Sequence, residues 1–122
     1  MSAFTKFADL RPYQIWEGAV ARAIHGHRIT AAVIDLAPNI DIREHNHENE
    51  QVGFVLKGKV IMIIDGQARE LSVGEGYLIL SNVRHSARTG SDGATVVDIF
   101  APVRADWEGA TRLEPSSGSW PS

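Results

Sequence analysis

Hydrophobic residues along the chain fall in short runs rather than in long stripes. From residue 18 onward, apolar runs alternate with turn residues, which is typical of antiparallel strands. No segment carries an extended apolar stripe at helical spacing. The predicted strands cover residues 20–24, 29–36, 52–56, 60–64, 77–80 and 95–101. The pattern therefore predicts an all-β protein, either a sandwich or a barrel.

Turn residues separate the predicted strands. Asp65-Gly66, between residues 60–64 and 67–71, is the strongest hairpin signal, because both central residues of a type I′ turn need positive φ. Further turns are expected at Gly26, Pro38-Asn39, Lys57-Gly58, 74–76 and 90–93. The turns predict a chain that reverses direction every few residues.

The length of 122 residues predicts one domain in three parts. Residues 1–17 are aperiodic and predict an N-terminal arm, and residues 18–107 predict the barrel. Residues 108–122 predict a C-terminal tail. The end of this tail, residues 115–122, has so little apolar content that we expect it to be frayed.

Composition and charge exclude several classes of function. The net charge is −3 and the pI is near 5.9, so the basic surface of nucleic-acid-binding proteins is not expected. The chain has no cysteine, which excludes disulfides, thiolate nucleophiles and iron–sulfur clusters. A metal ion would have to be bound by histidine, carboxylate or amide groups.

Neither a membrane span nor a signal peptide is expected. The longest aliphatic run, residues 60–64, is far shorter than the roughly 20 residues that a bilayer requires. An acid, Asp9, interrupts the N-terminal segment before an apolar region develops. The sequence thus predicts a soluble, cytoplasmic protein without a membrane partner.

His45-Asn46-His47 is the first candidate for chemistry. On a strand, residues two apart project from the same face, so both imidazoles can bind one metal ion. His25-Gly26-His27 has the same spacing, but Gly26 predicts a turn that directs the two rings apart. We therefore interpret His25 and His27 as structural residues.

An acid within an apolar run is the second candidate. Asp98 lies in the run 96–100, where burial is costly unless the carboxylate is paired or coordinated. Strand alternation places Phe100 on the same face. Asp98 is either a proton-transfer group in the barrel or the structural partner of an arginine. Arg104 is the natural partner, or else it binds a substrate carboxylate.

A longer pattern combines these histidines with glycines and a third histidine. It consists of His45-x-His47, Gln51, Gly58, Asp65-Gly66, Val73-Gly74, the run 79–83 and His85. Over residues 18 to 104 this spacing resembles the cupins. The resemblance implies a double-stranded β-helix, a jelly-roll barrel, with one divalent ion such as Zn, Ni, Mn or Fe inside. The metal ligands that it implies by position are His45, His47, Gln51 and His85.

Gln51 stands where most cupins have Glu. A neutral amide leaves the divalent ion its full charge, which suits a Lewis acid that holds an anionic substrate. Two alternatives remain open: Gln51 is a core hydrogen-bonding residue, or Glu48 or Glu50 replaces it as ligand. Glu50 should face the other way on an extended strand.

The segment Asp98-x-Phe100-x-Pro102-x-Arg104-x-Asp106-Trp107 narrows the resemblance. Together with Gln51 and the strand end 53–58, it resembles the pectin-degradation cupins of the KdgF type. These proteins convert unsaturated monouronates to linear keto acids. The resemblance implies an isomerase or hydratase-like enzyme in which Asp98 transfers the proton as the enol-ether ring is hydrated and opens. It also implies that Phe100 and Arg104 complete the catalytic site, with Arg104 fixing the carboxylate.

Arg43 is a further candidate for substrate binding. It lies two residues before His45, so an extended strand places it on the same face. Its guanidinium can bind a carboxylate in bidentate fashion, unless it is simply an exposed strand-end charge. A homodimer is expected from the resemblance alone.

Three other functions stay open. A cupin dioxygenase would require a redox-active metal and O₂ uptake. A polyketide-cyclase-like cupin would act on an aromatic substrate at a similar site. A non-enzymatic module would bind a sugar acid or a metal without changing it, and the sequence predicts no helix-turn-helix segment that would make it a regulator.

Overall fold

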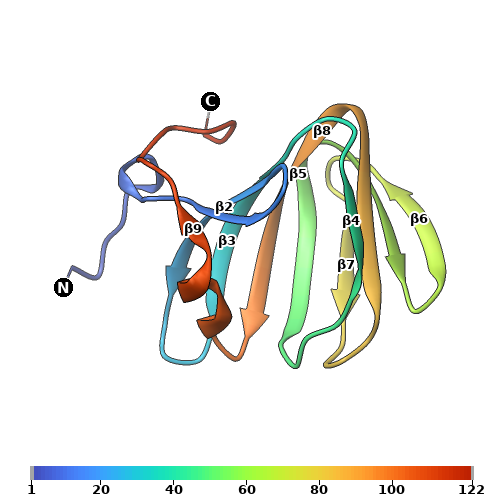
Figure 1. The fold of residues 1–122 in the computed structure, drawn as a ribbon, viewed down its shortest axis with the longest axis horizontal. Helices are drawn as coiled ribbons and strands as arrows, with labels where there is room; N and C mark the ends of the chain where they lie inside the picture. The colour runs from blue at the N-terminus through green and yellow to red at the C-terminus, as the bar shows by residue number, and fades with distance from the viewer. Residues whose placement is uncertain (1, 122) are drawn as a thin grey trace.

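The computed structural model describes residues 2–121, and it is built almost entirely of β-strands (Figure 1). Its elements are the 3-10 helix η1 (Phe7–Asp9), β1 (Tyr13–Trp16), β2 (Ala19–His25), β3 (Thr30–Leu36), β4 (Asp41–His45), β5 (Glu50–Ile64), β6 (Gln67–Leu71), β7 (Gly76–Ile79), β8 (His85–Ala101), the 3-10 helix η2 (Ala105–Gly109) and β9 (Thr111–Arg112). The all-β prediction is confirmed. Within the described residues, no helix has the length and apolar character needed to span a membrane.

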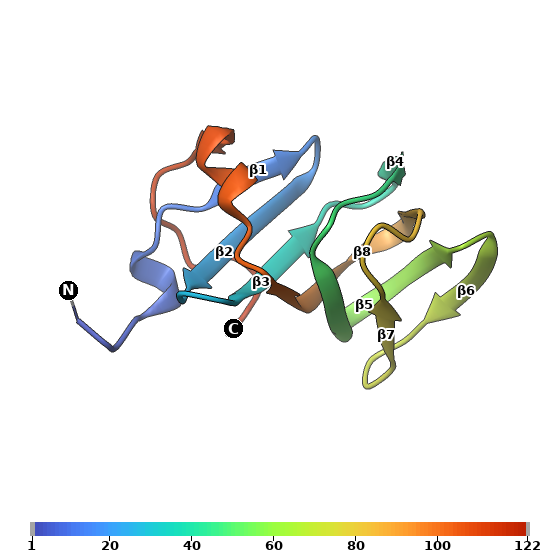
Figure 2. The same ribbon diagram turned by 90° about the horizontal axis from the view of Figure 1, so that it is seen from below.

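All strand pairs are antiparallel, and the two longest strands connect two layers. The N-terminal half of β8 pairs with β4 and with the C-terminal half of β5, which in turn pairs with β6. The C-terminal half of β8 pairs with β3 and with the N-terminal half of β5, which pairs with β7. Beyond β3 the order continues to β2, β1 and β9. Figure 2 shows the resulting jelly roll from below.

The side chains that face inward change phase within both long strands. In β5 the buried residues are odd-numbered at Gln51 and Val55 and even-numbered at Val60 and Met62. The pairing register of β5 with β8 shifts twice between residues 55 and 60. Such bulges insert an extra residue and bend the strand, so each strand turns from one layer into the other.

Two glycines make this bend sterically accessible. Gly58 in β5 and Gly93 in β8 both have positive φ, of 72° and 65°, which non-glycine residues adopt at a cost. Our prediction that Lys57-Gly58 and residues 90–93 are turns that end strands is therefore wrong. Hydrogen bonding continues on both sides of these residues, so the glycines bend β5 and β8 without interrupting them.

The Asp65-Gly66 hairpin is confirmed. Both residues have positive φ, 50° and 79°, and Ile64 pairs with Gln67 across the turn. These angles are those of a type I′ turn, whose twist matches that of the flanking strands. The local sequence was sufficient here because the turn type depends only on its two central residues.

The N-terminal arm and the tail both join the barrel. Within the expected arm, β1 pairs with β2 and with β9 of the expected tail. Our expectation of a frayed tail is wrong. Arg22 is 3% exposed, and it donates through Nε to the carbonyl oxygen of Ser116 at 2.9 Å and through Nη2 to its hydroxyl at 2.6 Å. Hydrogen bonds to this buried cation, together with an edge-to-face contact between Trp120 and Phe7 at 5.9 Å, hold the tail in place.

Candidate metal centre and adjoining cavity

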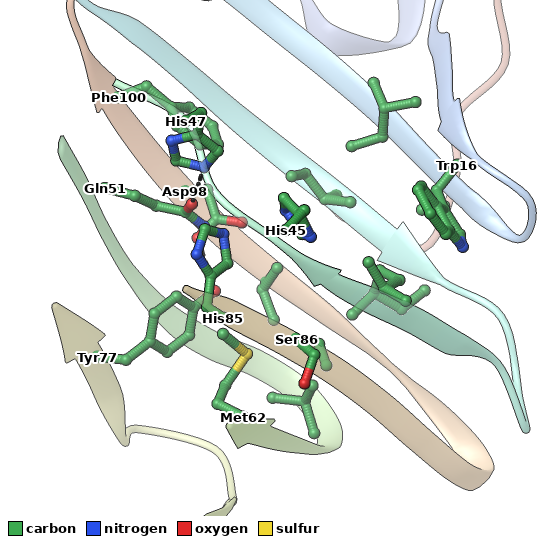
Figure 3. A pocket seen from close by; sticks show the side chains of 18 of the residues that line it. Trp16, His45, His47, Gln51, Met62, Tyr77, His85, Ser86, Asp98 and Phe100 are labelled. Carbon is green, nitrogen blue, oxygen red and sulfur yellow. Dashed lines mark hydrogen bonds between the residues drawn. The ribbon is translucent and has the colours of Figure 1, made fainter. Parts of the chain in front are cut away.

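Three histidines from two segments of the chain meet in the barrel (Figure 3). His45 ends β4, His85 begins β8, and these two residues are register partners; His47 lies two residues after the end of β4. One ring nitrogen of each histidine lies within 4.8 Å of the others. The resemblance to the cupins implied this convergence, and the structure brings the three rings together.

The ring orientation of all three histidines is fixed by the backbone. In each ring, Nδ1 lies within hydrogen-bond distance of a main-chain carbonyl, so Nδ1 carries the proton and Nε2 keeps a lone pair. For His45, His47 and His85 the acceptors are the carbonyl oxygens of Arg43, Asn49 and Val83, at 2.8, 2.9 and 2.9 Å. This arrangement is the usual support for metal-binding histidines.

Gln51 adds a fourth acceptor to the cluster. Its Oε1 lies 3.1 Å from Nε2 of His47. Since the proton of His47 resides on Nδ1, both of these atoms offer lone pairs, and a cation between them would satisfy both. Three imidazoles and an amide oxygen fit a first-row divalent ion such as Zn, Ni, Mn or Fe. The donor set therefore suits the metal that the sequence predicted.

Two of the histidines, His47 and His85, are also in the charge state that binds metals. Burial is the main cause that lowers the pKa of His85 to about 4, and the nearby charges of other histidines and Arg104 lower it further. Burial likewise lowers the pKa of His47, and Arg104 adds to the effect. Both rings are neutral at pH 7, so a metal ion would not compete with protons there.

A buried carboxylate, Asp98, faces the same cavity. Asp98 is 4% exposed, and Oδ1 accepts a hydrogen bond from the Tyr77 hydroxyl at 2.6 Å. Burial raises the pKa of Asp98 to about 6, although hydrogen bonds from Tyr77 and Gln51 and the charge of Arg104 oppose this rise. A carboxyl group that titrates near neutral pH can both donate and accept a proton.

Arg104 is held beside the cavity by aromatic rings and by Asp106. Its guanidinium lies 4.6 Å from the centroid of Phe100 and 4.9 Å from that of Trp107. Nε and Nη2 donate to the two carboxylate oxygens of Asp106. The structural ion pair between Asp98 and Arg104, which the sequence left open, is thus absent among the described residues, since Asp106 takes that place.

The cavity that these residues line has a volume of about 270 Å³. Its polar end carries the histidines, Gln51, Asp98 and Arg104. The remaining wall is largely apolar, and its larger side chains are Trp16, Ile34, Ile42, Met62, Phe100 and Trp107. A ligand here would meet charged and lone-pair groups at one end and hydrocarbon at the other.

Arg43 lies outside this set. It is exposed, and its guanidinium lies 5.4 Å from the centre of the Trp16 ring rather than along the cavity wall. Trp16 in turn stacks on His45, at 6.4 Å and an interplanar angle of 20°. The predicted role of Arg43 in substrate binding stays a prediction.

Sequence reasoning missed three residues of the site. Trp16 lay in the segment interpreted as an arm, and Tyr77 lay in a predicted strand with no role assigned to it. Asp106 could have been found from the sequence, because it stands two residues after Arg104 in the segment already singled out. His25 lies apart from the cluster, with Nδ1 2.8 Å from the Thr30 hydroxyl, in keeping with its structural interpretation.

A family model and a curated relative both match parts of this chain. The family model described as "Cupin domain" matches residues 32–100. The pectin degradation protein KdgF of Dickeya dadantii (strain 3937) is 31% identical over 64 residues, which are 52% of this chain and 58% of that protein. The chain thus aligns with little more than half the length of this curated relative.

Solved structures share the fold. An RmlC-like cupin from Shewanella frigidimarina NCIMB 400 superposes with a TM-score of 0.81 at 23% identity, covering 88% of this chain and 96% of that one. KdgF from Halomonas sp. superposes with a TM-score of 0.78 at 22% identity, covering 87% and 98%. At such identities the likeness shows a jelly-roll architecture.

Proposed function

Because the chain belongs to the cupin domain family, we propose that it is a metal-dependent enzyme that opens the ring of an unsaturated monouronate. The observation that carries the proposal is the buried carboxylate of Asp98 beside four converging lone-pair groups in one cavity. The sequence relative from Dickeya dadantii, a pectin degradation protein, supports a sugar acid as the substrate class.

In this proposal His45, His47, Gln51 and His85 hold one divalent ion. The support is geometric, since one ring nitrogen of each histidine lies within 4.8 Å of the others and the amide oxygen of Gln51 lies 3.1 Å from Nε2 of His47. When bound, the ion supplies Lewis acidity toward a substrate oxygen. The neutral ligand set leaves its charge undiminished, which favours an anionic substrate.

Asp98 is the proposed proton-transfer group. In the substrate, the ring oxygen belongs both to a hemiacetal and to an enol ether. Opening the hemiacetal breaks one carbon–oxygen bond, releases the proton of the anomeric hydroxyl and leaves an aldehyde and an enolate. Adding a proton to the far carbon of the enolate double bond gives the ketone, so the reaction is an isomerisation. With a pKa near 6, Asp98 can take up the first proton and return the second.

Arg104 and Phe100 are proposed to hold the substrate. The Asp106 pair uses Nε and Nη2 of Arg104, so Nη1 remains to meet a substrate carboxylate. Phe100 is 2% exposed and provides an apolar surface between Arg104 and His47, whose ring centroid lies 5.9 Å from that of Phe100. Arg43 could contribute only from outside the cavity wall.

A homodimer is part of the proposal, and one outer face of the barrel offers a surface for it. Val52 pairs with Leu78 on one side and with Ile99 on the other, and all three side chains are exposed. Ile24 and Phe54 are also exposed hydrophobic residues. Sheet faces with this many apolar side chains are commonly covered by a partner.

The test combines metal analysis with a turnover assay. Elemental analysis should find about one divalent ion per wild-type chain and little in His85→Ala. Wild-type protein should then remove the ultraviolet absorbance of unsaturated monouronates prepared with a pectin or alginate lyase. Asp98→Asn should keep its metal and lose about 10² to 10⁴-fold in turnover. A wild-type protein that carries metal but leaves these substrates unchanged would overturn the proposed reaction.

The apolar cavity wall favours a second candidate, a cyclase-like reaction on a larger aromatic substrate. Trp16, Ile42 and Met62 line a region that a small sugar acid would leave in contact with water. Saturable binding of polycyclic aromatic acids, together with no turnover of uronates, would move the assignment to this class. The polar end would then fix only the carboxylate of such a ligand.

A further inference from the structure

The Tyr77–Asp98 hydrogen bond connects two strands that are not neighbours. Tyr77 lies on β7 and Asp98 on β8, and both are register partners of the same residue, Gly53 on β5. The two side chains therefore meet directly over the backbone of an intervening strand. Figure 3 shows Tyr77 extending from β7 toward the polar end of the cavity, where Asp98 lies.

Gly53 is the residue that permits this contact. A Cβ atom at this position would collide with Oδ1 of Asp98 and with the ring and hydroxyl of Tyr77. Any other residue would separate the two side chains by occupying the space in which they meet. The glycine is needed here for the absence of a side chain, because its φ is not in the positive range that favours glycine.

Asp98 is consequently held by a donor from another strand. The Tyr77 hydroxyl on β7 donates to Oδ1 of Asp98 at 2.6 Å. Burial of Tyr77, with further contributions from the charge and hydrogen bond of Asp98, raises the pKa of the Tyr77 hydroxyl well above its ordinary value, so it remains a donor throughout the working pH range. The carboxylate thus has a fixed orientation before any ligand enters.

We propose that Tyr77 is a positioning residue, which fixes the carboxylate of Asp98 through a hydrogen bond that Gly53 makes sterically possible. This inference rests on the proposed function insofar as Asp98 transfers a proton. A reacting group that is displaced by about 1 Å can lose about 10²-fold in rate, so a fixed carboxylate has a direct effect on turnover. Tyr77 itself need not touch the substrate.

The test compares Tyr77→Phe with wild type in two measurements. High-resolution crystal structures of both proteins report the side-chain dihedral angles of Asp98, whatever the activity. Steady-state kinetics on unsaturated monouronates report kcat and KM separately, and elemental analysis reports metal content. The matched control is Tyr13→Phe, which removes the hydroxyl of another buried tyrosine, hydrogen-bonded to His25 rather than to Asp98.

We expect the Asp98 carboxylate to rotate or to occupy several conformations in Tyr77→Phe. We further expect kcat to fall about ten- to a hundred-fold, with KM and metal content within about twofold of wild type. Tyr13→Phe should change neither Asp98 nor kcat. An unmoved carboxylate in Tyr77→Phe, or a moved one with unchanged kcat, overturns the positioning role. If wild type proves inactive on uronates, the proposed reaction fails, and the crystal structures still decide whether Tyr77 holds Asp98.

Discussion

Arg104 and Asp106 form a two-point ion pair at the edge of the cavity, with Nε to Oδ1 at 3.0 Å and Nη2 to Oδ2 at 2.9 Å. The guanidinium side of this pair is 12% exposed, and the carboxylate side is 61% exposed. The hydrogen bonds from Arg104 are the main cause that lowers the pKa of Asp106. The exposed carboxylate of Asp106 therefore orients the largely buried guanidinium of Arg104.

Asp106→Asn should weaken substrate binding more than turnover. The amide can accept only one of the two hydrogen bonds, so the guanidinium loses its fixed plane. We expect KM for an anionic substrate to rise several-fold, about 1 kcal/mol of binding, with kcat and metal content little changed. The control is Glu114→Gln, which removes the acid of an exposed ion pair with Arg11. Equal KM values in both variants would refute the orienting role of Asp106.

Asp98→Asn should change how stability depends on pH in the metal-free protein. Burial raises the pKa of Asp98 from 3.8 to about 6, so the folded chain retains a proton that the unfolded chain has already released. This carboxyl group therefore destabilises the fold progressively as the pH rises between these two values, by up to about 3 kcal/mol. The free energy of unfolding of Asp98→Asn, relative to wild type, should increase over this interval.

The pKa shift of His85 has the opposite effect on stability over an overlapping pH range. Its pKa falls from 6.5 to about 4 on folding, so stability is lost as the pH drops between these values. Since Asp98→Asn removes only the opposing contribution, the variant should lose stability on acidification more steeply than wild type. Urea unfolding in the presence of EDTA, at several pH values from 4 to 7, measures both slopes. A difference that does not vary with pH would contradict the burial argument.

Divalent metal should raise the melting temperature only while the histidine cluster is complete. Free ion at a hundredfold excess over its Kd adds about 2.7 kcal/mol, or roughly 10 °C for a chain of this size. His85→Ala should lose this increment, which differential scanning fluorimetry with and without EDTA can measure. His27→Ala should retain it, because His27 is exposed in the turn after β2. Loss of the increment in both variants would point to a metal site elsewhere.

Ser116→Ala should destabilise the fold without affecting the site. The hydroxyl of Ser116 accepts from Nη2 of buried Arg22, and hydrogen bonds to charged groups contribute about 1.5 to 3 kcal/mol. Chemical unfolding should show a loss of this order, whereas Ser117→Ala removes an exposed hydroxyl and should be neutral. Metal stoichiometry should stay the same in both. Equal stability of the two variants would mean that the tail contributes little.

The sequence was informative wherever chemistry depends on residue type and spacing. Strand alternation placed His45 and His47 on one face, and the resemblance to the cupins added His85. The apolar residues on either side of Asp98 likewise predicted that this carboxylate is buried. Tyr77 was not predicted, because its contact with Asp98 depends on the register of β7 and β8 against a third strand, which no local pattern specifies.

The fold prediction contained two errors, one at the glycines of the bends and one in the C-terminal tail. Glycines at positions 58 and 93 were interpreted as strand ends, although a positive φ serves equally in a bulge. The tail was interpreted as frayed because it has little apolar content. Buried Arg22 anchors it through hydrogen bonds, and the sequence alone does not indicate that Arg22 is buried.

The change of phase in the two long strands makes the site sensitive to chain length at the bend. Inserting or deleting one residue between 89 and 94 would turn Asp98 and Phe100 toward solvent while His85 still faced inward. A matching change between residues 55 and 60 would be required to restore the pairing. Natural length variation in related chains should therefore accumulate in loops and be absent from these two bends.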